Sequence, residues 1–248
     1  MISIDSLRVA ILGLTVTVSG MSTGGLLAYC LRHTKRNLMH LVIIISTGLI
    51  GTLVLIDILP ESINLGGSFA TTVGIGIGYF IARNLDRFFH RVVIFTSNPQ
   101  SDVFLHSALL LSIGIALHNL PVGIALGNSI LNEPELAKHI SIAIAIHAIP
   151  EGIAIGLPMV LSKISPLVLF VIVSITGFPT ALGAFAGYQF GILDPWFLSI
   201  VLGLAIGTIL YVAYFELLVP SWKDRGALQS ILCLLLGMFM AVWFIISF

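Results

Sequence analysis

The segment IALHNLPVGIALG, from Ile115 to Gly127, returns 29 residues later as IAIHAIPEGIAIG, from Ile144 to Gly156. Eight of the thirteen positions are identical, and each copy carries a histidine, a proline three residues later and a GxxxG pair. GxxxG spacing lets helix backbones approach closely within a membrane. A proline in such a helix leaves a carbonyl one turn earlier without its usual partner, so that this carbonyl can face a polar cavity. The repeat therefore predicts two closely packed transmembrane helices beside a polar site.

The whole chain has the composition of a membrane protein. Hydrophobic residues make up 58% of it and charged residues 9%, with a mean hydropathy of +1.11. A soluble fold of 248 residues could not bury that much apolar surface. The net charge of zero offers no basic surface for nucleic acid, which excludes that class of partner. The two cysteines, Cys30 and Cys233, form neither a disulfide framework nor a thiolate metal cluster.

Runs of apolar residues divide the chain into transmembrane segments. A bilayer core takes about 20 helical residues to cross. Runs of this length lie near 8–29, 39–59, 66–82, 104–127, 137–161, 166–190, 196–219 and 227–247. The first run lacks an evident cleavage site, so we expect it to remain as a span. The sequence therefore predicts an all-α polytopic membrane protein with eight transmembrane helices, forming a single transporter domain over residues 1–248.

Basic residues predict the orientation through the positive-inside rule. With both termini external, the cytoplasmic loops contain nine of the eleven basic residues: Arg32, Lys35, Arg36, Arg83, Arg87, Arg91, Lys163, Lys223 and Arg225. The external side keeps only Arg8 and Lys138. A span miscounted by one would destroy this bias. Either a bacterial inner membrane or a plasma membrane fits the pattern.

The repeat also places ionisable residues near the middle of two neighbouring spans. His118 belongs to the fourth predicted span, and His147 and Glu151 belong to the fifth, four residues apart and so on one helix face. His118 alone fits a hydrogen-bonded packing residue as well as a ligand. A carboxylate at the bilayer centre is costly unless it is protonated, paired or metal-bound, and such acids mark functional pathways. Two imidazoles and a carboxylate suit Zn²⁺ or Fe²⁺, with water or another group completing the shell.

Other acidic residues lie closer to the span ends, and the sequence leaves their role open. Asp57-Ile-Leu-Pro-Glu-Ser62 ends the second span, and the looser echo Glu216-Leu-Leu-Val-Pro-Ser221 ends the seventh. A role in metal passage and a role as interfacial carboxylates fit these acids equally. Acid and histidine pairings in the flanks fit proton relays or solvated helix ends: Asp102 with His106, and Glu133 and Glu135 with His139.

The motifs of the fourth and fifth spans resemble those of the ZIP family of metal transporters, HN-x-PEG and H-x-x-PEG. The copies here are His118-Asn-Leu-Pro-Val-Gly123 and His147-Ala-Ile-Pro-Glu-Gly152, and TGFPTALGAFAGY in the sixth span adds to the match. The resemblance implies an α-helical carrier in which helices 1–3 and 6–8 form inverted repeats around helices 4–5. It further implies a divalent metal moved toward the cytosol, a homodimer, and metal ligands at His118, Asn119, His147 and Glu151.

Three positions depart from the family pattern. The fourth-helix glutamate of the family is Val122 here, the polar residue after the fifth-helix histidine is Ala148, and the sixth-helix glutamate aligns with Thr180. Only Asn119 and Glu151 then remain at the family's second metal position. A transport-deficient relative that serves as a metal sensor or partner scaffold is therefore the alternative function.

Signatures of intramembrane enzymes are missing from the sequence. It contains no HExxH, no GxGD after a span and no GxSxG serine with a paired histidine. We therefore expect a protein that is not an enzyme and has no prosthetic group. The expected partners are the transported metal and the lipid bilayer.

Overall fold

The structure is a computed structural model that describes residues 4–33, 36–92, 99–132, 134–191, 194–223 and 226–247. Lys35, Glu133 and Arg225, which entered the charge and relay predictions, lie outside these ranges. The long helices are α1 (Ile4–Cys30), α2 (Arg36–Leu53), α3 (Leu59–Val92), α4 (Pro99–Asn132), α5 (Pro134–Leu161), α6 (Pro166–Phe190), α7 (Pro195–Tyr211) and α9 (Ala227–Ser247). The short ones are η1 (Leu31–His33), α8 (Val219–Lys223) and two π-helical segments, η2 (Val54–Ile58) and η3 (Val212–Leu218). Within the described ranges the chain is all-helical, as predicted.

Local sequence signals begin and end several helices. Ser165 caps α6 by accepting a hydrogen bond from the Val168 amide, and Asp194 caps α7 by accepting from the amides of Trp196 and Phe197. In both cases proline follows at the first helical position, where its missing N–H costs no helical bond. Gly191 ends α6 with a φ of 80°, a left-handed conformation that suits glycine.

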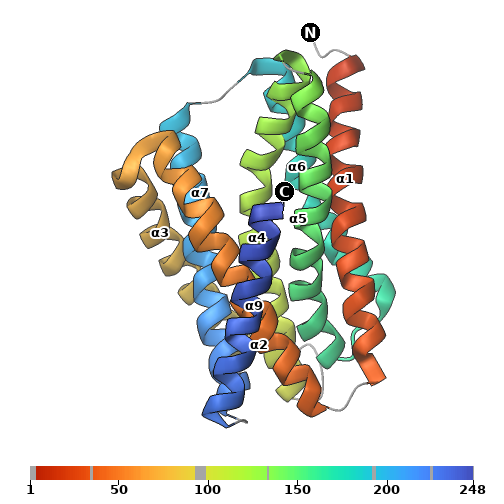
Figure 1. The fold of residues 1–248 in the computed structure, drawn as a ribbon, viewed down its shortest axis with the longest axis vertical. Helices are drawn as coiled ribbons and strands as arrows, with labels where there is room; N and C mark the ends of the chain where they lie inside the picture. Colours follow the sequence, from red (N-terminus) through yellow and green to blue (C-terminus); the bar gives the residue numbers. More distant parts are fainter. Residues whose placement is uncertain are drawn as a thin grey trace.

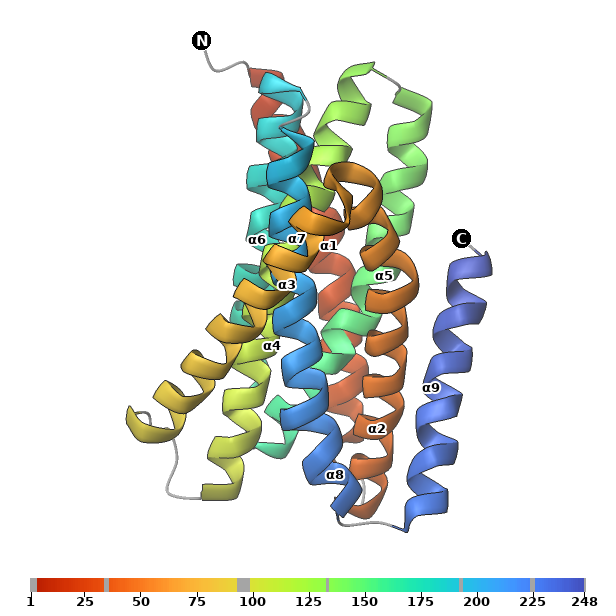
Figure 2. The ribbon, with the colours of Figure 1, turned by 90° about the vertical axis from the view of Figure 1, so that its left-hand side faces the viewer.

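The apolar helices are long enough to cross a bilayer. Six helical stretches in the described ranges meet this requirement, and one of them, His40–Phe88, runs for 49 residues, more than twice the length of one crossing. A shorter apolar segment, Ala227–Trp243, lies in α9. Along the chain the helices alternate in direction: α1, α3, α5 and α7 run downward and α2, α4, α6 and α9 run upward (Figures 1 and 2). The polytopic fold is confirmed, and the count of eight spans stays a prediction.

The link between the second and third predicted spans is largely helical. Helical structure continues from α2 through η2 into α3, and only Gly67 interrupts it, with φ 83° and ψ 166°. A proline lacks the N–H that an α-helical turn needs, and the π-helical segment η2 directly precedes Pro60. The chain then turns back at Gly67, because glycine alone adopts this conformation readily.

Packing partners follow the expected inverted repeat. The repeat pairs α1 with α6, α2 with α7, α3 with α9 and α4 with α5. Under this exchange the α1–α5 contact becomes the α6–α4 contact, and the α3–α7 contact becomes the α9–α2 contact. The π-helical segments η2 and η3 also correspond under this exchange. The contacts divide the bundle into two groups, α1, α4, α5 and α6 on one side and α2, α3, α7 and α9 on the other. Figure 2 shows α9 beside α2 at the edge of the second group.

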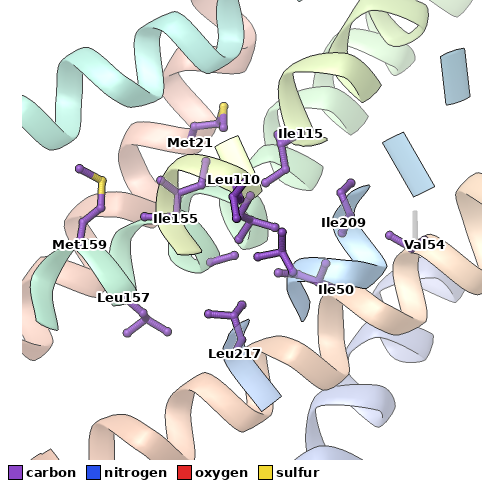
Figure 3. Close-up of a cluster of buried hydrophobic side chains, with 14 of the residues drawn as sticks. Met21, Ile50, Val54, Leu110, Ile115, Ile155, Leu157, Met159, Ile209 and Leu217 are labelled. Carbon is purple, nitrogen blue, oxygen red and sulfur yellow. The ribbon is translucent and has the colours of Figure 1, made fainter. Parts of the chain in front are cut away.

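The largest apolar cluster joins both groups. Figure 3 shows side chains from α1, α2, α4, α5 and α7 pointing toward one another, among them Met21, Ile50, Leu110, Ile155 and Ile209. All five are almost completely buried. This part of the bundle is therefore lined by buried apolar side chains that join the two groups.

Candidate metal centre

Three ionisable side chains of the repeat converge where α4 and α5 pack together. The ligand atoms of His118, His147 and Glu151 all lie within 4.8 Å of one another. His147 Nε2 is 3.8 Å from Glu151 Oε1, because residues four apart share one helix face. Around a tetrahedral zinc with bonds of about 2.0–2.1 Å, ligand atoms stand roughly 3.4 Å apart. Shifts of about 1 Å in side-chain position would bring the three groups to that spacing.

These side chains are removed from solvent. His118 is 3% exposed and Glu151 is 7% exposed, while the His147 side chain is 21% exposed. Nδ1 of His118 is buried and makes no hydrogen bond to any described residue. A buried polar atom without a partner is costly, and a bound cation is one partner that removes this cost for a histidine nitrogen.

Glycines hold the two helices of the repeat in place. A Cβ on Gly123 of α4 would collide with the Thr180 carbonyl of α6, and a Cβ on Gly152 of α5 would collide with the Met21 carbonyl of α1. Backbone therefore lies directly against backbone at both GxxxG sites, as predicted. The ligand-bearing faces of α4 and α5 are consequently set by close contacts with α6 and α1.

Asn119 lies next to the three converging side chains without being one of the group. Its side-chain Nδ2 donates a 3.0 Å hydrogen bond to the Thr176 carbonyl of α6. The residue is buried and lines the same cavity as His118. The amide is thereby held in one orientation, with its nitrogen engaged by α6 and its Oδ1 left as the group that could coordinate a cation.

A cavity of about 260 Å³ contains the candidate site. Beyond the site residues its wall includes Asp57, Glu61, Ala143, Ile144 and Ile245. Ala143 and Ile144 precede His147 on α5, whereas the apolar cluster takes Ile155, Leu157 and Met159 from the other side of Glu151. The cavity thus extends from the site toward the end of the bundle where α5 begins. The apolar cluster closes the opposite direction.

Two of the acids left open by the sequence belong to this cavity. Asp57 and Glu61 are both exposed, and they line it together with the histidines. Glu216, their counterpart in the seventh predicted span, is instead buried and accepts a 3.0 Å hydrogen bond from Ser107 Oγ. Each of the two acids lies in a π-helical segment, Asp57 in η2 and Glu216 in η3, so their different surroundings come from the helices that pack around them.

The remaining flank residues lie away from the cavity lining. Asp102 and His106 are buried on α4, and His139 is exposed on α5. The side chains of Glu133 and Glu135 lie outside the described residues. The apolar contribution of Ile245 from α9 had no signal in the sequence, because it depends only on where α9 packs.

Of the three residues that depart from the family pattern, two line the cavity and one does not. Val122 and Ala148 line the cavity, so an aliphatic surface occupies positions where polar groups would face the site. Thr180 is fully buried against α4 and α1, and its Oγ1 makes no hydrogen bond to any described residue. It does not line the cavity.

Comparisons with known proteins agree with this geometry. The family described as ZIP zinc transporter matches residues 96–245. The chain is 32% identical over 235 residues to zinc transporter ZupT of Chlorobium luteolum, covering 86% of this chain and 88% of that protein. It is also 32% identical over 252 residues to zinc transporter ZupT of Chlorobium limicola, covering 92% and 94%. These matches and the long apolar helices make it a multi-pass integral membrane protein, and the chain belongs to the ZIP family of zinc transporters.

Proposed function

We propose that this chain carries a divalent transition metal across the bilayer toward the cytosol, and that Zn²⁺ and Fe²⁺ are the first candidates. The convergence of His118, His147 and Glu151 within 4.8 Å carries the proposal. Zinc comes first because the ZupT relatives are named zinc transporters. The metal is cargo, so the protein needs no prosthetic group and is not an enzyme.

In this proposal His118, His147 and Glu151 bind the metal, and Asn119 lies beside it with its carbonyl oxygen available. Two neutral imidazoles and one carboxylate balance one of the two charges on the ion. An uncompensated charge in an apolar setting raises the free energy of the bound state. The site should therefore bind metal moderately and release it readily, which suits a carrier.

Asp57 and Glu61 would attract the cation into the cavity. They are the acids on its wall nearest the bundle end where α5 begins, and their negative potential raises the local concentration of cations. With both termini external, this end faces outward and the apolar cluster separates the site from the cytosol. Inward movement of metal then requires the helices around the apolar cluster to rearrange.

The finer organisation follows the sequence. We place residues 1–248 in one transporter domain, in a bacterial inner membrane or a plasma membrane, with the nine cytoplasmic basic residues setting the orientation. A homodimer is the assembly that family membership suggests.

Flux in proteoliposomes tests the function. Purified protein is reconstituted into liposomes, external Zn²⁺, Fe²⁺ or Mg²⁺ is added, and the metal inside the washed liposomes is measured by elemental analysis. Saturable uptake of a transition metal, absent from protein-free liposomes and for Mg²⁺, supports the carrier. The alternative of a metal sensor or scaffold rests on Val122 and Thr180, and the transporter relatives do not favour it. Stoichiometric zinc binding without flux would establish that alternative instead.

A further inference from the structure

A second cavity lies where the ends of α1, α4 and α5 meet, next to the first cavity along α5: Ser141 lines the second and Ala143 lines the first. Its volume is about 260 Å³, and it shares none of its lining residues with the first cavity. Arg8 of α1 and Lys138 of α5 line it, together with the apolar side chains Val9, Leu12 and Ile130. Two cations thus stand at a hollow whose remaining walls are largely hydrocarbon.

The identity of these two cations is informative. Arg8 and Lys138 are the only basic residues on the predicted external side, and the other nine of the eleven belong to the opposite side. They are 130 positions apart in sequence, yet the fold brings both to one cavity. Lysine and arginine are depleted from external loops by the positive-inside rule, so two that remain and meet invite a specific explanation.

Their position fits the polar surface of a bilayer. Arg8 lies four residues after Ile4, where α1 begins, and Lys138 lies four residues after Pro134, where α5 begins. Basic side chains this close to the ends of apolar helices reach lipid headgroups. Both also stand near the N-terminus of their helix, where the helix dipole adds a partial positive charge.

From this combination we infer that the cavity binds an anionic phospholipid of the surrounding leaflet. The phosphodiester lies between Arg8 and Lys138, and one acyl chain runs along Val9, Leu12 and Ile130. Ser141, which also lines the cavity, can donate a further hydrogen bond to the headgroup. A free phosphate ion would gain nothing from the apolar wall, which is why the lipid is the fitting occupant.

Arg8 has an acidic neighbour, Asp5. Arg8 Nη1 donates a 3.1 Å hydrogen bond to Asp5 Oδ1, and the two side chains are 75% and 62% exposed. Exposed ion pairs contribute little, so this contact does not prevent Arg8 from turning to a phosphate. Removal of the Asp5 charge should therefore strengthen lipid binding, a change that a purely structural role for Arg8 would not predict.

Occupancy would join α1 to α5 at one end of the bundle. These two helices already pack along their length, and α5 carries two of the three candidate metal ligands. A lipid that bridges their ends would hold this pair together independently of metal.

The test measures lipid binding directly, without metal. Purified protein in detergent is titrated with phosphatidylglycerol or phosphatidylcholine and analysed by native mass spectrometry. We expect a clear preference for phosphatidylglycerol, lost by about fivefold for each of Arg8→Gln and Lys138→Gln and increased in Asp5→Asn. The matched controls Arg83→Gln and Lys163→Gln, which remove exposed cations outside this cavity, should bind as the unmodified protein does.

Two further arms separate the remaining outcomes. If a glutamine variant does not fold, Arg8→Lys and Lys138→Arg keep the charge and should retain binding. An excess of inorganic phosphate should not displace the lipid, and full displacement would replace the lipid site with a small-anion site. Equal binding of the two lipids, or equal losses in the control variants, would overturn the inference.

Discussion

The imidazole rings of His118 on α4 and His147 on α5 face each other with centroids 5.8 Å apart and planes inclined by 46°. The two residues occupy the same position in the two copies of the repeat, so the repeat supplies two equivalent candidate ligands. Glu151 breaks the equivalence, because its counterpart four residues after His118 is Val122. The candidate centre therefore has symmetric nitrogen donors and a single carboxylate.

Removal of one ligand should abolish saturable metal uptake. We expect Glu151→Gln and His147→Ala to be inserted and folded but to show no saturable zinc flux in proteoliposomes, because each change removes metal-binding free energy outright. His139→Ala is the matched control, since His139 is an exposed residue of the same helix that does not line the cavity. Uptake by Glu151→Gln at the unmodified rate would refute the proposed site.

Replacement of Val122 by glutamate should make the site bind metal more tightly. Val122 lines the cavity and projects from the same face of α4 as His118, so Val122→Glu would add a second carboxylate beside the metal. That carboxylate would cancel the remaining charge of the bound ion, raise affinity, and bring occupancy closer to two. Slower release should lower the maximal flux.

Metal titration of both forms, by calorimetry with metal analysis of the purified protein, checks this prediction. Val122→Gln is the control, since it adds a polar side chain of similar size without the charge and should leave affinity far closer to that of the unmodified protein. Two metals already bound to the central site of the unmodified protein, or weaker binding in Val122→Glu, would contradict it.

Cysteine labelling should reveal the orientation. In a background without Cys30 and Cys233, single cysteines at Ser68 and Asn132 should react with an impermeant external thiol reagent, and those at Asn84 and Lys163 should not. All four positions are exposed, so accessibility itself does not decide the result. Permeabilised cells provide the control in which every position reacts. The reverse pattern in intact cells would invert the predicted topology.

Close helix packing predicts a large stability difference between two identical substitutions. A Cβ on Gly24 would meet backbone atoms of Ile149, Gly152 and Ile153 in α5, whereas a Cβ on Gly76 would meet nothing within 4 Å. Gly24→Ala should destabilise the protein by about 1–3 kcal/mol, because backbone cannot move aside as a flexible side chain can. Gly76→Ala should be neutral or stabilising by up to about 1 kcal/mol. Thermal unfolding in detergent micelles compares the two, and equal melting temperatures would disprove the packing argument.

Much of the helical fold was readable from the sequence because its signals are local. Apolar length predicts each membrane helix, and the GxxxG spacing predicts that α4 and α5 each pack closely against another helix, which is α6 for α4 and α1 for α5. His147 and Glu151 lie on the same helix face because they are four residues apart. The link between the second and third predicted spans is helical as far as Gly67, a detail that the apolar runs do not indicate.

Only the tertiary structure decided which distant residues share a cavity. Asp57 and Glu216 look alike in the sequence, yet Asp57 lines the candidate metal centre and Glu216 is buried against Ser107. Arg8 and Lys138 meet at a second cavity although nothing between them in sequence indicates it. The physical reason is that helix formation depends on neighbours within a few residues, whereas a shared cavity depends on which helices pack together and at what rotation, which the many contacts of the whole bundle decide jointly.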